Sequence, residues 1–193
     1  MRTGSSRGSL RVLGIDPGLT RCGVGVVDVA ADRSAQLVHV GVVRSDPDAP
    51  IEERLAVIAA GLRAVLEAHV PDVVAVERVF AQHNRQTVMG TAQASGIALL
   101  IAGERGIPAA THTPSEVKAA ITGYGNADKR QVQTMVARVL RLEELPKPAD
   151  AADALALALC HAWRGAPAAS SRSSGPLTPA QRAWADAERL ARR

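Results

Sequence analysis

The chain has 193 residues, 47% of them hydrophobic, which is enough for one globular domain with a sizeable core. Aromatic residues make up only 2%, and every apolar stretch is too short or too interrupted to span a bilayer, which excludes an integral membrane protein. The net charge of +4 comes from the two ends, since residues 12–163 carry 14 basic and 17 acidic residues, so overall charge gives little support for nucleic-acid binding.

Composition divides the chain into three parts. Residues 1–9 are polar and rich in glycine and serine, which predicts a disordered leader, while residues 165–193 predict a flexible basic tail with a helical stretch near 179–190. Residues 10–164 form the expected folded domain. Its two cysteines, Cys22 and Cys160, lie in apolar patterns, so we expect reduced core residues and a cytoplasmic protein.

The first half of the domain predicts three strands, a helix and a fourth strand. Leu10–Ile15, Cys22–Val29 and Gln36–Val43 are short, apolar and separated by turn residues, which is typical of an antiparallel meander. Apolar positions follow helical spacing through Ile51–Ala68. The Val-Val-Ala-Val run within Asp72–Glu77 suits a strand that is buried on both faces.

The second half alternates between helices and one further strand. Asn84–Arg105 predicts a long helix whose small-residue face suits either the sheet or a second subunit, and Ile107–His112 predicts the fifth strand. A capping box then begins a short helix, Asn126 is expected to cap a helix ending near Leu142, and Asp150–Trp163 predicts the last helix. This order predicts an α/β fold with a mixed five-stranded sheet and helices on both faces.

Four carboxylates occupy positions where packing gives no reason for an acid. Asp16 and Glu77 end two of the apolar strands. Asp150 and Asp153 lie about one turn apart at the start of the alanine-rich helix. Taken singly, they fit a turn residue, a solvated strand end, and the N-cap and N3 positions of a helix. Together they indicate one site, since function in open α/β sheets gathers at the carboxyl ends of strands.

The four acids have the chemistry of a metal site. Hard carboxylate oxygens select Mg²⁺ or Mn²⁺ over softer ions, and we expect two Mg²⁺ ions per subunit with Mn²⁺ as a substitute. Two such ions about 3.5–4 Å apart activate a water on one side of a phosphodiester and stabilise the leaving oxygen on the other. Residues 116–141 add five basic residues against two acids, which suits an anionic substrate beside the acids.

Four motifs follow one another in the domain with ordinary spacing: Leu13–Gly18, Ala75–Phe80, Val117–Lys118 with Gly123–Lys129, and Ala149–Leu155. Together they resemble the RuvC family of Holliday junction resolvases. The resemblance implies an RNase H-like fold and a homodimer that resolves four-way DNA junctions by paired, symmetric, metal-dependent nicks in homologous recombination and DNA repair. It also implies partnership with the RuvA–RuvB branch-migration complex. The metal-binding catalytic set that it implies is Asp16, Glu77, Asp150 and Asp153.

The resemblance extends to residues that would contact DNA. Phe80 enters a polar loop just after the acid of the second motif, and it is either a core residue or, as the resemblance favours, stacks on an unpaired base. Lys118 and Lys129 are either solvated helix charges or the family lysines that serve the scissile phosphate and the backbone. Arg85 and Arg130 are two further candidate DNA contacts.

Three histidines raise the question of a second kind of metal site. No spacing pairs His83, His112 or His161 convincingly as ligands. We therefore expect all three to be structural or solvated.

Three other functions share part of this pattern. A sugar-kinase or actin-like ATPase also opens with Gly-x-Asp-x-Gly, but it needs two lobes, for which this chain is too short; nucleotide binding would identify it. A non-catalytic junction-binding protein would not need the complete set of acids. An RNase H-like nuclease acting on RNA would lack the match around Phe80 and Lys118, and would leave a four-way junction uncut.

Overall fold

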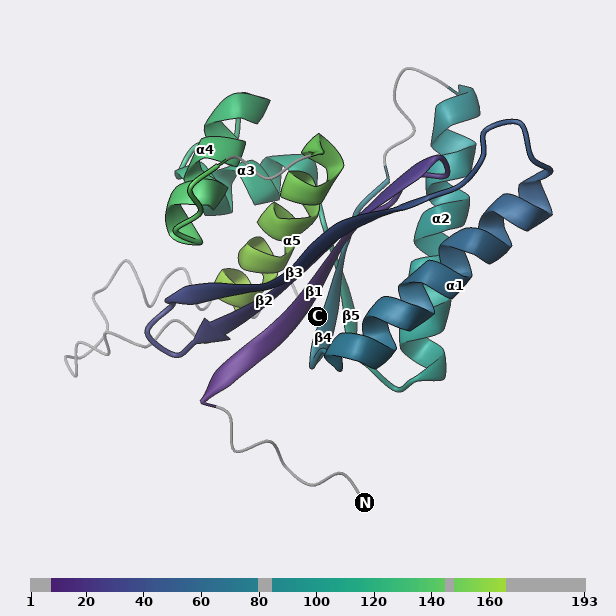
Figure 1. The fold of residues 1–193 in the computed structure, drawn as a ribbon. Helices are drawn as coiled ribbons and strands as arrows, with labels where there is room; N and C mark the ends of the chain where they lie inside the picture. Colours follow the sequence, from purple (N-terminus) through teal and green to yellow (C-terminus); the bar gives the residue numbers. More distant parts are fainter. Residues whose placement is uncertain (1–7, 80–84, 145–147, 166–193) are drawn as a thin grey trace, which may run out of the picture.

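The computed structural model describes residues 8–79, 85–144 and 148–165. Its five strands are β1 Ser9–Asp16, β2 Arg21–Ala30, β3 Ala35–Arg44, β4 Val73–Glu77 and β5 Ala109–His112. They form one sheet in the order β3-β2-β1-β4-β5, in which β1 to β3 are antiparallel and β4 and β5 run parallel to β1 (Figure 1). The expected meander and the mixed five-stranded sheet are confirmed.

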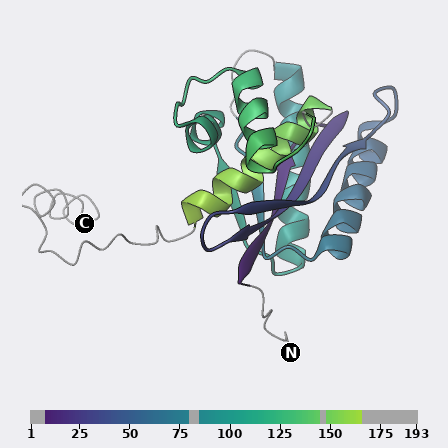
Figure 2. The same ribbon diagram turned by 60° about the vertical axis from the view of Figure 1, so that its left-hand side comes forward.

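Helices cover both faces of this sheet. They are α1 Ile51–His69, α2 Arg85–Glu104, α3 Pro114–Thr122, α4 Lys129–Val139 and α5 Ala149–Gly165. α1 and α2 pack on one face, and α5 packs on the other with α3 and α4 beside it (Figures 1 and 2). Within the described ranges, no helix is both long enough and apolar enough to cross a membrane.

Alternation along the central strands divides the core into two clusters. On β1, Val12 packs with the α3, α4 and α5 side, whereas Leu13 packs with α1 and α2. On the parallel neighbour β4, Val73 and Val74 divide in the same way. Successive strand residues point to opposite faces, so a continuous apolar run is needed where both faces are covered.

Glycines in the strands bring α5 unusually close to the sheet. A Cβ atom on Gly14 would lie 1.9 Å from the carbonyl oxygen of Ala154, and one on Gly23 would lie 2.1 Å from that of Asp150. Neither position has room for any other side chain while the helix keeps its place. The backbone of α5 therefore rests directly on β1 and β2.

Three expected boundaries need correction. Asp128, not Asn126, caps α4, because its carboxylate accepts a 2.8 Å hydrogen bond from the Gln131 backbone and the Gln131 side chain accepts one from Asp128. That helix ends at Val139, earlier than expected. α5 begins at Ala149, which places Asp150 inside its first turn instead of at the N-cap.

The proposed leader and tail lie largely outside the described residues. β1 begins at Ser9, one residue inside the expected leader, and α5 ends at Gly165. Residues 1–7 and 166–193 are not described, so the predictions of a disordered leader and a flexible tail stay predictions.

Candidate active site

The topology brings the four acids to one end of the sheet. Asp16 and Glu77 are the last residues of β1 and β4, which are adjacent and parallel, so both leave the sheet at the same edge. On its other side Asp16 pairs with Gly23 of β2, the glycine on which the backbone of Asp150 rests. The first turn of α5, which also carries Asp153, is therefore held beside Asp16.

Electrostatics shows that the four carboxylates lie close together. Burial, followed by the negative charges of Glu77 and Asp153, raises the pKa of Asp16 to about 8, with smaller contributions from a hydrogen bond to Glu77 and from Asp150. Burial also raises the pKa of Glu77, and the charge of Asp153 adds to this rise. Without a cation, the cluster therefore retains a proton at neutral pH.

Two basic side chains partly neutralise the cluster. Nζ of Lys129 lies 2.7 Å from Oδ2 of Asp153, a contact that raises the pKa of Lys129. Nε of Arg21 lies 2.8 Å from Oδ2 of Asp150. That oxygen is nevertheless buried without a hydrogen-bond partner, so the Arg21 contact is one of proximity and charge and lacks the geometry of a hydrogen bond.

The donor set suits a hard divalent cation, although its side chains are not yet oriented around one. In the described part of the chain, no three His, Cys, Asp or Glu side chains already form a metal-ligand group. Instead, Asp150 and Asp153 each contact a basic side chain, Arg21 and Lys129 respectively. The ligands are all carboxylate oxygens, one of them buried and unsatisfied, and a bound cation would displace the proton on Asp16.

A hollow of about 250 Å³ opens beside the acids, and its polar lining comes from Glu77, Asp153, Lys118 and Lys129. Capping boxes fix the start of α3 at Thr113 and the start of α4 at Asp128. They thereby place Lys118 and Lys129 at the hollow. A negatively charged group in this hollow would meet both ammonium groups next to the carboxylates.

The remaining predicted contacts are not gathered in this way. Arg130 is exposed on α4 and does not line the hollow. Arg85 is the first residue of α2, but its side chain lies outside the described structure. Phe80 and His83 also lie outside the described residues. The assignments of Phe80, Arg85 and Arg130 to DNA therefore stay predictions.

Sequence reasoning missed two arginines at the site. Arg21 pairs with Asp150, and Arg54 of α1 lines a second hollow together with Arg21. Arg21 directly precedes an apolar run and Arg54 is a polar position in a helical pattern, so neither has a local signal for this role. Glycine within an otherwise β-branched strand was the available signal for the close approach of α5, at Gly23 and again at Gly25.

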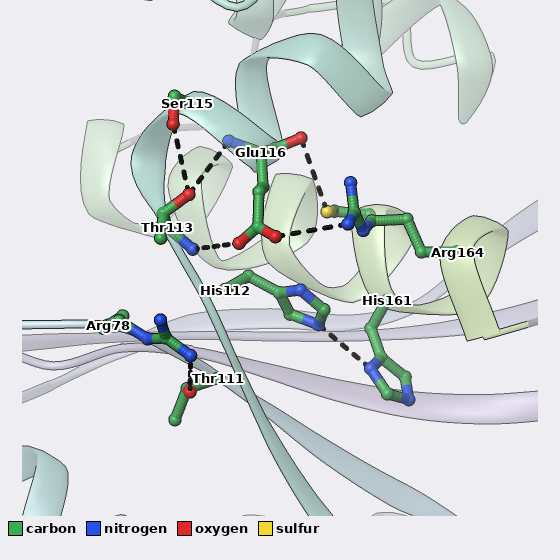
Figure 3. A network of polar contacts seen from close by, with 9 residues as sticks. Arg78, Thr111, His112, Thr113, Ser115, Glu116, His161 and Arg164 are labelled. Atoms are coloured by element: carbon green, nitrogen blue, oxygen red, sulfur yellow. Dashed lines mark hydrogen bonds and ion pairs between the residues drawn. The ribbon is translucent and has the colours of Figure 1, made fainter. Parts of the chain in front are cut away.

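Two of the histidines that were expected to be structural or solvated contact each other in the fold. Nε2 of His112, at the end of β5, lies 3.0 Å from Nδ1 of His161 on α5 (Figure 3). Chiefly because of burial, the pKa values of both rings are lowered. Glu116 joins the same network by accepting a hydrogen bond from Thr113 and pairing with Arg164 at 3.2 Å. The pair is structural, as expected, and ties the edge strand to α5.

Comparison with known proteins gives the same account of the chain. The family model described as crossover junction endodeoxyribonuclease RuvC matches residues 12–161. A crossover junction endodeoxyribonuclease RuvC from Leifsonia xyli is 63% identical, over 94% of this chain and 93% of that protein. One from Streptomyces griseus is 64% identical, over 80% of this chain and 76% of that protein.

Solved structures support the same fold. Thermus thermophilus RuvC in complex with Holliday junction substrate has a TM-score of 0.78 and 40% identity, covering 81% of this chain and 95% of that one. The yeast mitochondrial Holliday junction resolvase Ydc2 has a TM-score of 0.57 at 16% identity, a likeness of fold alone. The expected RNase H-like fold is confirmed.

Proposed function

We propose that this chain, which belongs to the RuvC family of crossover junction endodeoxyribonucleases, holds the divalent metal ions for junction cleavage on its four clustered carboxylates. The family consists of divalent-metal-dependent nucleases that resolve Holliday junctions in recombination and repair, and membership decides against an ATPase, a non-catalytic binder and an RNA nuclease. The observation that carries the proposal is the raised pKa of Asp16, to which burial and the charges of Glu77, Asp153 and Asp150 contribute, although the four acids come from three elements distant in sequence.

We assign the site two Mg²⁺ ions per subunit, replaceable by Mn²⁺, since its ligands are all hard oxygens. Bound there, such ions supply an activated water and stabilise the leaving oxygen of a phosphodiester. The chain's own residues prepare the site: Asp16 gives up its proton, and Arg21 and Lys129 release the two α5 carboxylates. Lys118 and Lys129 then hold the phosphate in the hollow beside the acids.

A test of this assignment is the substitution Asp150→Asn, which keeps the shape of the side chain and removes its negative charge. Nicking of a labelled four-way junction in Mg²⁺ should fall by at least about 10³-fold, because several kcal/mol of metal-dependent stabilisation are lost. Junction binding should persist, and linear duplex DNA and EDTA serve as negative controls. Asp32→Asn, at an exposed turn between β2 and β3, is the matched control and should cut normally. Near-normal cutting by Asp150→Asn contradicts the metal assignment.

We also propose a homodimer that forms through α2, which would place two acidic sites on one junction for symmetric nicks. The exposed positions of α2 form an uncharged face through most of its length: Met89, Ala92, Gln93, Gly96, Leu99, Leu100 and Gly103. A Cβ atom on Gly96 or Gly103 would meet nothing within 4 Å, so neither glycine is required by packing within the subunit. Leu100 on this face is 54% exposed. Its substitution by Glu should give monomers in sedimentation, because a charge would then lie in the apolar interface.

The remaining proposals rest on the family. The match over residues 12–161 supports a nuclease domain at 10–164, with the leader and the basic tail outside it. Four-way junction DNA is the proposed substrate, and the RuvA–RuvB complex is the proposed partner that delivers it. Buried, unpaired Cys22 and Cys160 fit a cytoplasmic protein.

A further inference from the structure

A second hollow, of about 630 Å³, adjoins the acidic cluster. Its polar and charged lining comes from Thr20, Arg21, Arg54, Thr91 and Asp150. It shares no lining residue with the hollow of the two lysines. Asp150 lines the one hollow and Asp153, one helical turn on, lines the other, so the acids lie between two cationic recesses.

The turn after β1 positions Arg21. A Cβ atom on Gly18 would lie 2.2 Å from the carbonyl oxygen of Arg21, so only glycine lets the chain fold back this tightly. The turn brings Arg21 to Asp150, and its side chain remains 47% exposed. Arg21 is therefore both a counter-ion of an acid and a cation that faces solvent.

Arg54 is held rigidly without any negative partner. Its Nε donates to Oγ of Ser45 at 3.1 Å and its Nη2 donates to Oγ1 of Thr20 at 2.7 Å, while Nη1 reaches the Pro47 carbonyl oxygen at 3.4 Å. Buried Ser45 is itself fixed, because its hydroxyl donates to the Leu19 carbonyl oxygen at 2.6 Å. No carboxylate among the described residues forms an ion pair with this guanidinium. It keeps its full charge and has N–H groups left to donate.

We propose that Arg21 and Arg54 bind a backbone phosphate of the junction strand, on the side of the acids opposite to Lys118 and Lys129. The inference rests on the proposed function, because it takes the acids as the place of cleavage. A strand laid across a carboxylate cluster gains from cations on both sides, and phosphate contacts fix its register. Arg21 serves Asp150 in the metal-free protein and turns to the phosphate once metal holds that carboxylate. Arg54 is already oriented by its hydrogen bonds, and the planar donor geometry of its guanidinium suits a phosphate.

The first test measures junction affinity against salt concentration, with Mg²⁺ present, in an Asp16→Asn background that prevents cutting. Arg21→Gln and Arg54→Gln should each weaken binding and reduce the slope of log K against log salt, and the double variant should reduce it by about one unit, the value for one phosphate. Arg63→Gln, on the same helix but paired with Glu104, is the matched control and should keep the parent slope. Slopes equal to the control overturn the proposal.

A structural role for Arg54 gives a different result. If it only fastens the turn after β1 to α1, Arg54→Gln lowers the melting temperature and leaves the salt slope unchanged, which also overturns the proposal. Arg54→Lys keeps the charge, so it should recover most of the slope without restoring the hydrogen-bonded fork. Because this readout is binding, it fails independently of the cutting assay on Asp150→Asn.

The second test locates the phosphate. Junctions are made with a single uncharged methylphosphonate at each position in turn around the cut. One neutral linkage next to the cut should weaken binding of the Asp16→Asn protein but not of its derivative with both Arg21→Gln and Arg54→Gln, since both partners of that phosphate are already gone. Equal losses in both proteins at every position contradict the assignment.

Discussion

The two faces of the sheet are packed in different ways, and only one of them carries the carboxylates. Beneath α1 and α2 the sheet meets its helices through large aliphatic side chains, among them Leu13, Ile58 and Leu62, all fully buried. Beneath α5 the strands present Gly14 and Gly23, and helix backbone lies against strand backbone. The first face has a layer of side chains between its elements, and the second at these points has none.

This difference separates stability from precision. A layer of aliphatic side chains can repack after a substitution, so the distance between its elements is adjustable at a modest energetic cost. Direct backbone contact has no such freedom, since the added atoms must displace the helix itself. The carboxylates of α5 are therefore positioned by the rigid face, and the adjustable face supplies buried apolar area. A site that needs its ligands placed within about 0.5 Å gains from this arrangement.

The strongest way to break the comparison is Gly23→Ala. The new Cβ would lie 2.1 Å from the Asp150 carbonyl oxygen and must push the first turn of α5 outward. A displacement of about 1 Å costs roughly 10²-fold in rate, so single-turnover nicking per folded molecule should fall by that amount. The control on the other face is Leu62→Ala, which should lower the unfolding free energy by about 2–5 kcal/mol with little change in that rate. Equal rates for the two variants would refute the separation.

A second prediction concerns pH in the metal-free protein. The pKa of Asp16 is raised to about 8, so its contribution to stability is complete below its ordinary value of 3.8 and is lost as pH rises towards 8. In EDTA, the melting temperature should therefore fall across this range, and Asp16→Asn should flatten the fall. Thermal unfolding at stepped pH measures both. The rise in melting temperature on adding Mg²⁺ should be larger at high pH, where no proton competes; superimposable curves for variant and parent would argue against a buried acid cluster.

The smallest expected effect concerns the histidine pair. Burial lowers the pKa values of His112 and His161, so the unfolded chain binds protons more readily, and stability is lost as pH falls below about 6.5. His161→Gln removes one titrating ring, which should weaken this acid-side loss and change the free energy of unfolding at pH 8 by only about 1 kcal/mol. Chemical denaturation at pH 8 and at a pH below about 6.5 measures the free energy of unfolding in both conditions. An unaltered acid-side loss in the variant would exclude the pair as its origin.

Much of the fold and the acidic site could be predicted because both depend on local patterns. Asp16 and Glu77 end apolar strands, and parallel neighbours bring such ends together, so their convergence follows from strand order. Asp150 and Asp153 share a helix face through their spacing alone. The helix cap was harder, since Asn126 and Asp128 are both good caps and only the side chain of Gln131 decides between them.

The features that could not be predicted depend on contacts between segments that are distant in the sequence. Arg21 contacts Asp150 because β2 lies under α5. His112 contacts His161 because the end of β5 lies next to the same helix. Nothing in the residues around any of these four positions specifies the partner. The role of Arg54 could not be predicted for a similar reason, since its side chain is oriented by neutral acceptors from two other loops.

Arg21 and Lys129 balance part of the carboxylate charge from within the chain itself, which affects how the protein can fold before it binds a metal ion or DNA. A cluster of four carboxylates would ordinarily demand an external ion before the chain could close around it. Here two of the acids already have cationic partners and a third retains a proton. The chain can therefore complete its core before a divalent ion binds, so that folding and ion binding are separate events.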